Sequence, residues 1–255
     1  MWQSGLGLTD GQVGILSGAL TFAIAAGSLL AGNITKLFGL IRSFNMMNLM
    51  YLIGAAICVL SGNFPVLLAG LIITGFASGA DLPISLTVIS HDAPNEKVSA
   101  SLIASTQVFW QIGVLGSYAM AFIVSHVEGA AGARMVFALL AVLAGIAFVW
   151  RTFSKKFKEF HAAGDEYRAA EGTKTSTEVS FASLFKGTDG KKYVSFFSCI
   201  IIFYVCWNLL ANTFGQFQTY ILVKANASQS LATGCGIVLN IVCLLYTSPS
   251  PRDPK

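Results

Sequence analysis

The chain of 255 residues is 55% hydrophobic and 11% charged, and its mean hydropathy is +0.68. Soluble domains carry about 25% charged residues, so this composition excludes an ordinary soluble domain and indicates an integral membrane protein with several helices. The formal net charge of +4 gives no reason to expect nucleic acid as a partner.

Several apolar stretches are long enough to cross a membrane, which takes about 20 helical residues. We expect complete spans at about 11–32, 43–62, 65–89, 101–125, 133–152 and 193–222, and the start of another near residue 230. Glycine is abundant, with 25 residues. Because small residues let helices approach closely in lipid, we expect a packed bundle.

Basic residues concentrate in alternate connections between the expected spans. Lys36 and Arg42 lie in the first of these connections, Lys97 in the third, and the segment 151–192 holds most of the others. The positive-inside rule places these connections in the cytoplasm and the N-terminus outside. We therefore expect a multi-pass protein of the inner (plasma) membrane, with the lipid bilayer as its surroundings.

The segment 153–192 differs in composition from the rest of the chain. KKFKEFHAAGDEYRAAEG is charged and favours a helix, GTKTSTE indicates a break, and FASLFKG is typical of a short amphipathic helix on the membrane surface. We expect this segment to be a cytoplasmic loop that joins two helical bundles.

Both ends of the chain look cut. Met1 leads directly into the polar loop WQSGLGLTDGQ, with no signal peptide. The tail CLLYTSPSPRD, which starts at Cys243, resembles the in-frame translation of an adapter from transposase-based short-read libraries. We therefore exclude 243–255 from fold reasoning and expect the natural protein to continue beyond Val242, the alternative being a native proline-rich tail.

The layout is similar to that of the major facilitator superfamily, in which twelve spans form two six-helix halves joined by a long cytoplasmic loop. The resemblance makes 1–152 family helices 2 to 6, 153–192 the central loop, and 193–242 helix 7 with the start of helix 8. The implied fold class is an all-α polytopic membrane protein that lacks helix 1 and most of the second half.

The stretch LTDGQVGILSGALTFAIAAGSLLAGNITKLFGLIRS carries part of this resemblance. The spacing of Gly27, Gly32 and Gly39 is similar to that of family helix 2 and the following loop. Lys36 stands where the family has an Asp, and Arg42 alone remains of the usual basic residues. The resemblance implies that this loop contributes to a cytoplasmic gate, although its altered charges differ from the family latch.

The stretch SHDAP, residues 90–94, resembles a Ser-Glu-x-Ala-Pro-like sequence of the sugar porters. His91 stands in place of the Glu, with Asp92 beside it. One interpretation is a turn that ends the third span, because Asp, Pro and Asn favour turns. The other is a charge contact of His91 and Asp92 with the loop that holds Lys36 and Arg42.

Polar side chains in the fourth span match helix 5 of the sugar porters. Gln107, Gly113 and Tyr118 reproduce the family spacing Q-x5-G-x4-Y. Gln111 lies four residues after Gln107, on the same helix face, with Trp110 beside it. An amide donates and accepts hydrogen bonds, which suits a hydroxyl-rich substrate. The resemblance implies substrate contact, and a hydrogen bond between helices is the alternative.

The span 193–222 holds amides at four-residue intervals, at Asn208, Asn212 and Gln216. Aromatic residues lie nearby, and rings beside amides suit a sugar or polyol. The family signature of this helix is not reproduced, so a polar seam between helices is the alternative.

Asp81 is the acidic residue well inside a span, close to Pro83, which is able to open the helix backbone there. Acids within membranes are functional candidates and often carry protons. We keep two interpretations of Asp81, proton coupling and a structural or gating ion pair.

Sequence signatures of enzymes are missing, including the phosphate loop, HExxH and GxSxG, and the cysteines show no metal-ligand spacing. We therefore expect a non-enzyme with neither cofactor nor metal. The expected function is secondary transport of a sugar, polyol or similar hydrophilic metabolite by alternating access, with the proton as a candidate coupling ion and the full-length protein monomeric. The rivals are a transporter of organic anions or drugs and a membrane sensor or scaffold that binds a partner through 153–192.

Overall fold

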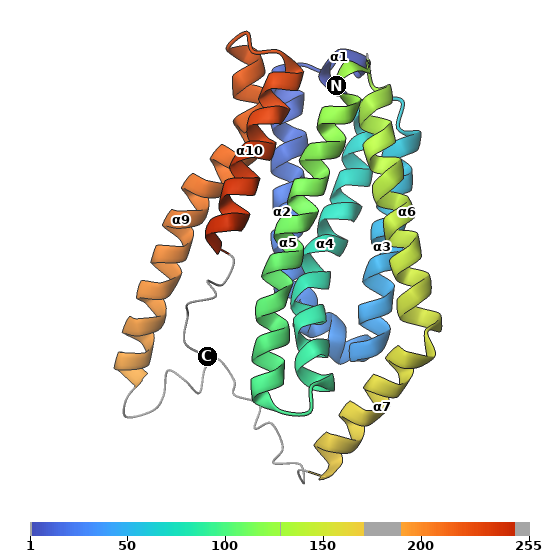
Figure 1. Cartoon of the computed structure of the whole chain (residues 1–255), viewed down its shortest axis with the longest axis vertical. Coiled ribbons are helices and arrows are strands. Elements are labelled where there is room, and N and C mark those ends of the chain that lie inside the picture. Colours follow the sequence, from blue (N-terminus) through green and yellow to red (C-terminus); the bar gives the residue numbers. More distant parts are fainter. Residues whose placement is uncertain (1, 128, 171–189, 248–255) are drawn as a thin grey trace. The chain divides into compact units, whose positions relative to one another are not determined.

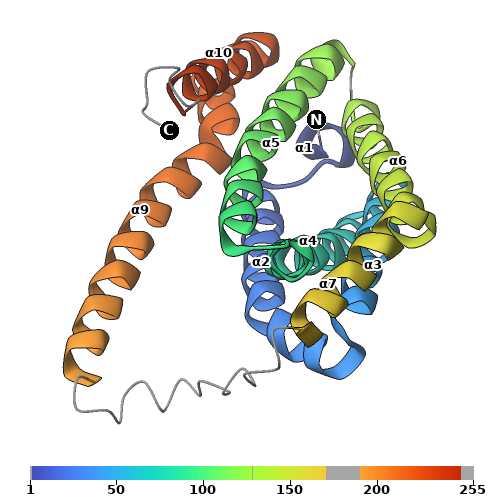
Figure 2. The ribbon, with the colours of Figure 1, turned by 60° about the horizontal axis from the view of Figure 1, so that its bottom comes forward.

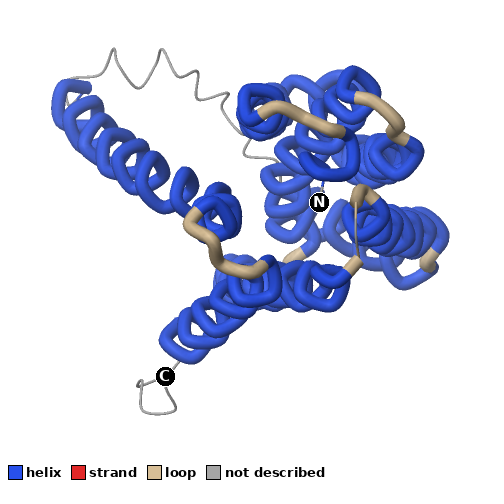
Figure 3. Tube along the Cα trace, turned by 90° about the horizontal axis from the view of Figure 1, so that it is seen from above, coloured by secondary structure: helices blue, strands red, loops and turns tan. Residues whose placement is uncertain are grey.

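The computed structural model describes residues 2–127, 129–170 and 190–247, and within these ranges it contains helices and turns but no strand (Figure 3). The all-α fold class predicted from the sequence is therefore confirmed. The chain divides into two compact units, Met1–Asp165 with Gln229–Lys255 and Glu166–Ser228, and each is described by itself. The predicted amphipathic stretch at 181–187 and the end of the tail, 248–255, lie outside the described residues.

The first unit is a helical bundle whose members, apart from α10, follow one another through short connections. They are α1 (Trp2–Leu6), α2 (Asp10–Phe38), α3 (Leu40–Leu60), α4 (Phe64–Asp92), α5 (Glu96–Ile123), the 3-10 helix η1 (Val124–His126), α6 (Ala131–Phe153), α7 (Lys155–Ala170) up to Asp165, and α10 (Gln229–Thr247). The helices α2 to α6, with η1 continuing the span of α5, are long and apolar enough to cross a membrane, which confirms the first five predicted spans.

The second unit contains α9 (Gly190–Lys224), which encloses the predicted span 193–222. Its described apolar stretch is Val194–Leu210. The predicted start near residue 230 corresponds to α10, whose apolar stretch is Gln229–Cys243 and which remains helical to Thr247.

Side-chain caps fix where several helices begin. Thr9 and Gln12 form a capping box at the start of α2, with hydrogen bonds of 3.0 and 3.3 Å. Asn63 accepts from the backbone N–H of Val66 at 3.1 Å, and Asn95 does the same for α5. Each such cap contributes about 1 kcal/mol, because it satisfies an N–H group that has no partner within the helix.

Glycines bring α2 and α4 into close contact, as the abundance of glycine predicted. A Cβ atom at Gly27 would overlap the Phe76 carbonyl, and one at Gly75 would lie 2.8 Å from the carbonyl oxygen of Leu20. Only glycine allows the two backbones to approach so closely in lipid.

The same contact explains why α4 continues through Pro83. Proline has no N–H group, so the carbonyl of Gly79, four residues earlier, loses its helical donor. The Ser28 hydroxyl of α2 donates to this carbonyl at 2.8 Å. The helix is therefore unbroken at Pro83, and the opening of the backbone expected there does not occur.

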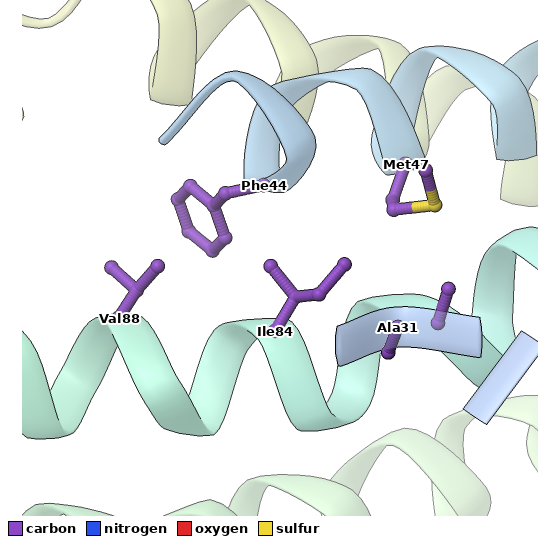
Figure 4. Packing of buried hydrophobic residues seen from close by; sticks show 6 residues of the cluster. Ala31, Phe44, Met47, Ile84 and Val88 are labelled. Atoms are coloured by element: carbon purple, nitrogen blue, oxygen red, sulfur yellow. The ribbon is translucent and has the colours of Figure 1, made fainter. Parts of the chain in front are cut away.

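A cluster of buried side chains joins α2, α3 and α4. Figure 4 shows Phe44 and Met47 of α3 facing Ile84 and Val88 of α4, with Ala31 of α2 beside them. α4 lies between α2 and α3 (Figure 2), and it has the largest share of buried residues among the five spans. Side chains on α4 are therefore positioned by two neighbouring helices.

The connections that carry Lys36, Arg42 and Lys97 lie at one end of this bundle, together with α7, and α1 lies at the other end (Figure 1). The alternation of basic and non-basic connections in the sequence thus corresponds to the two ends of the bundle. We refer to the first as the basic end.

Candidate functional site

Asp81 forms an ion pair with Arg151, a partner that could not be predicted from sequence spacing. Arg151 lies in the last turn of α6, and its Nη1 atom is 2.8 Å from Oδ1 of Asp81. The side chain of Arg151 is 21% exposed and that of Asp81 is 27% exposed, so both are largely shielded. This contact corresponds to the structural or gating ion pair, one of the two interpretations of Asp81 drawn from the sequence.

Arg151 is held by α3 as well as by α4. Its guanidinium carbon lies 4.0 Å from the centroid of the Phe44 ring, and Nη1 donates to the Phe44 carbonyl at 3.4 Å. With its amide oxygen turned toward Arg151, Asn48 accepts from Nη1 and Nε at 3.0 and 3.1 Å. These contacts engage Nη1 and Nε of the guanidinium, so the pair is held between three helices.

The chemistry of this cluster is charge neutralisation. A single charge within a membrane span is costly, and pairing it with an opposite charge and hydrogen bonds removes most of this cost.

The residues predicted for the cytoplasmic loop gate lie around the turn between α2 and α3. Gly39 has φ 84°, a conformation that favours glycine, and its N–H donates to the Thr35 carbonyl as α2 ends. Gly32 has open space around its Cα atom, and the side chains of Lys36 and Arg42 are exposed. The structure gives Gly39 a role in the turn.

The SHDAP stretch forms the predicted turn, since α4 ends at Asp92 and α5 begins at Glu96. Asp92 contacts two histidines, His91 at 2.9 Å and His161 of α7 at 2.6 Å. His161 is not among the residues predicted for this gate, and it lies 69 residues from Asp92 along the chain.

The amides of α5 lie near Asn240 of α10, an amide that is not among the predicted site residues. The Gln111 Nε2 atom is 3.5 Å from Oδ1 of Asn240 on α10, at the outer limit for a hydrogen bond. Gln107 and Trp110 are exposed, whereas Gln111 is half-buried. The signal in the sequence that could have identified Asn240 is its position as an amide within the apolar run LATGCGIVLNIV.

α5 and α10 are joined by further polar and close contacts. The Ser125 and Ser230 hydroxyls are 3.0 Å apart, and a Cβ atom at Gly236 would overlap the Tyr118 ring. An open groove of about 710 Å³ beside these contacts is lined by apolar groups such as Phe122 and Val238. Such a lining does not suit a hydroxyl-rich molecule, so this groove is not the candidate site.

The predicted amides of the second unit lie on α9. Asn208 donates from Nδ2 to the Tyr204 carbonyl of its own helix at 2.8 Å. The side chains of Asn212 and Gln216 lie outside the described residues. In the described part of the chain no group of three or more His, Cys, Asp or Glu side chains has the geometry to hold a metal ion.

Comparison with known proteins identifies the family. The family described as "Sugar (and other) transporter" matches residues 3–180. The chain is 30% identical to the minor myo-inositol transporter IolF of Bacillus subtilis (strain 168), over 98% of this chain and 57% of that protein. It is 26% identical to the D-xylose-proton symporter-like 2 of Arabidopsis thaliana, over 59% of this chain and 30% of that protein.

A third relative is the niacin transporter NiaP of Acinetobacter baylyi (strain ATCC 33305 / BD413 / ADP1), 27% identical over 47% of this chain and 27% of that protein. The chain thus spans at most 57% of the length of these curated relatives. Taken with the membrane-spanning helices, the match over 3–180 shows that this multi-pass membrane chain belongs to the sugar (and other) transporter family of the major facilitator superfamily, a family of transporters and not of enzymes.

Proposed function

We propose that the protein transports a sugar, polyol or similar small hydrophilic metabolite across the inner (plasma) membrane by alternating access. The family match over residues 3–180 is the observation that carries this proposal. The name of the relative IolF supports a polyol, since myo-inositol is a carbon ring that carries hydroxyl groups. In alternating access two halves of a transporter rock about a central site.

The amide groups on α5 and α10 support a hydroxyl-rich substrate. Gln111 and Asn240 each offer both a donor and an acceptor, and their mutual contact of 3.5 Å is long enough to be exchanged for bonds to hydroxyls. Gln107 and Trp110 extend the same face of α5. We propose these four residues as substrate contacts, with Asn208, Asn212 and Gln216 contributing from α9.

We propose that the Asp81–Arg151 pair acts as a gating ion pair rather than as a free proton carrier. The 2.8 Å contact and the additional partners of Arg151 support this interpretation. Proton coupling at Asp81 is the second candidate, and it is favoured by the name of the xylose-proton symporter-like relative. In the gating arrangement, Asp81→Asn slows uptake but leaves its dependence on pH unchanged, whereas loss of that dependence assigns proton coupling to Asp81.

An organic acid is the rival substrate, because one relative is a niacin transporter. An anion carrier needs a cation that is available within a span, and Arg151 already neutralises Asp81. The charge arrangement therefore favours a neutral substrate over an anion.

Uptake by the full-length gene product in membrane vesicles tests the proposal, with labelled myo-inositol, xylose and nicotinate as probes. We expect transport of myo-inositol or xylose, and a loss of about tenfold in kcat/KM for Gln111→Leu, because one hydrogen bond in the transition state is worth about 1.4 kcal/mol. The matched control is Asn33→Leu, an exposed amide on α2. Transport of nicotinate alone supports the organic-acid rival, and flux for none of the probes supports the sensor or scaffold.

A further inference from the structure

The helix α7 is docked against the end of α4 at the basic end of the bundle. A Cβ atom at Gly164 would lie 2.9 Å from the His91 carbonyl oxygen and 3.0 Å from Oδ1 of Asp92, so the two backbones approach closely. His161 is buried in this contact, with ring centroids of Phe44 and Phe157 at 6.4 and 6.1 Å. The face of α7 that packs against α4 therefore includes His161 and Gly164.

Two histidines and two aspartates connect the helices across this contact. His161 of α7 donates from Nδ1 to Oδ2 of Asp92 at 2.6 Å. His91 of α4 lies between two carboxylates, with Nδ1 2.9 Å from Oδ1 of Asp92 and Nε2 3.2 Å from Oδ1 of Asp165 on α7. We call these four residues, His91, Asp92, His161 and Asp165, the His–Asp cluster.

The geometry indicates which of the two histidines is suited to carry a positive charge. An ionised carboxylate only accepts hydrogen bonds, so a ring nitrogen facing it must carry a hydrogen. Both nitrogens of His91 face carboxylate oxygens, and His91 therefore fits this position as an imidazolium. Deprotonation would place a nitrogen lone pair against a carboxylate oxygen and turn an attraction into a repulsion.

His161 has the opposite requirement. Its Nδ1 faces Asp92, but its Nε2 is buried and has no hydrogen-bond partner in the described part of the chain. The neutral form with hydrogen on Nδ1 satisfies Asp92 and leaves only a bare acceptor buried. A second proton would bury a charged N–H group without an acceptor, which is more costly.

We propose that the His–Asp cluster is a proton-sensitive latch: protonation of His91 strengthens the contact of α7 with α4, and loss of that proton weakens it. Histidine is the side chain whose charge ordinarily changes between about pH 5 and 8. The contact is therefore stronger at low pH and weaker at high pH. It uses groups distinct from Asp81 and from the proposed substrate contacts.

Arg151, the charged group stacked on the ring beside His161, does not reverse this dependence on pH. On α3 the group that faces His161 is the Phe44 ring, and the guanidinium of Arg151 from α6 is stacked on that ring. Arg151 already has Asp81 as its counter-ion. The side chain of Asp165 is 77% exposed, so water screens its contact with His91 and the expected effect is moderate.

Hydrogen–deuterium exchange of the full chain in lipid nanodiscs tests the latch between about pH 5.5 and 8.5. A single helix of this length is only marginally stable in water, so release from α4 lets α7 exchange. With rates corrected for intrinsic exchange, we expect the protection of α7 to fall about fivefold from the acidic to the basic end, as expected for one screened ion pair. The protection of the α4 interior stays constant.

His91→Gln is the decisive variant, because glutamine keeps hydrogen-bonding capacity but does not titrate in this range. We expect α7 protection in this variant to be independent of pH, whereas the matched control His126→Gln, at the other end of α5, keeps the response of the unmodified chain. Asp165→Asn keeps an acceptor and removes the charge, so it should reduce the response. If His91→Gln also lowers the protection of α4, that variant has disturbed the bundle itself. The response of Asp165→Asn to pH then decides the test.

The latch is overturned if α7 protection does not change with pH in the unmodified chain. It is equally overturned if His91→Gln with an intact α4, or otherwise Asp165→Asn, keeps the full response. Because exchange is measured without substrate, either result is independent of whether the transport proposal is correct.

Discussion

The hydrogen bond from Ser28 to the Gly79 carbonyl provides the sharpest test of how α2 and α4 are held together. The carbonyl lacks a helical donor because residue 83 is proline, and Ser28 Oγ supplies one at 2.8 Å. Ser28→Ala removes this donor and leaves a carbonyl without a partner at a close helix–helix contact. An unsatisfied buried acceptor costs about 1–3 kcal/mol, and hydrogen bonds between membrane helices average about 0.6 with a maximum of about 1.7 kcal/mol.

We therefore expect Ser28→Ala to lower the free energy of unfolding by about 1–1.5 kcal/mol. The measurement is a titration with sodium dodecyl sulfate in mixed micelles, followed by circular dichroism. Ser105→Ala is the matched control, since Ser105 is exposed and donates within its own helix to the Ser101 carbonyl. The control should change the free energy of unfolding by less than about 0.5 kcal/mol, as most surface substitutions do.

A double-mutant cycle with Pro83→Ala isolates the cause. Alanine at position 83 restores an N–H group that donates to the Gly79 carbonyl, so Ser28→Ala should then cost about 1 kcal/mol less than in the unmodified chain. Equal costs in both backgrounds would refute the reasoning, because the contribution of Ser28 would not depend on the missing donor at position 83.

Three further changes have defined outcomes in the same titration. Gly79→Val places a side chain on the Ile24 carbonyl, and we expect a loss of at least about 3 kcal/mol or separation of α2 from α4. Arg151→Gln leaves Asp81 without its counter-charge, and Asp81→Asn leaves Arg151 without its own, so each should lower the free energy of unfolding, and the double variant should cost less than the sum of the two single variants. Asn95→Ala removes the cap of α5 and should cost about 1 kcal/mol.

The presence and order of the spans could be predicted because a membrane permits few structures. Backbone groups in lipid must be satisfied within the segment, so an apolar run of about 20 residues implies a helix. The residues at which the helices end were harder to predict from hydropathy. The first span was predicted to end at residue 32, but α2 continues to Phe38, because the chain turns at Gly39 and not where hydropathy falls.

Residues that act through distant partners could not be predicted in the same way. Asp81 stood out as an acid within a span, but its partner Arg151 lies 70 residues away at a helix end, where an arginine is ordinary. His161 likewise lies in a charged helix that resembles many cytoplasmic segments. Hydropathy and spacing describe one helix at a time, whereas these pairs depend on how helices pack.

The polar groups at the basic end follow one physical rule. Asp81, shielded within α4, has a partner on α6, and Asp92 has one on α7, so each carboxylate makes a contact that depends on a second helix. The Phe44 ring touches both clusters, with Arg151 on its face and His161 at its edge. Displacing α7 therefore removes His161 from the edge of this ring. The two clusters thus share one side chain, Phe44, on which Arg151 is stacked and beside which His161 lies.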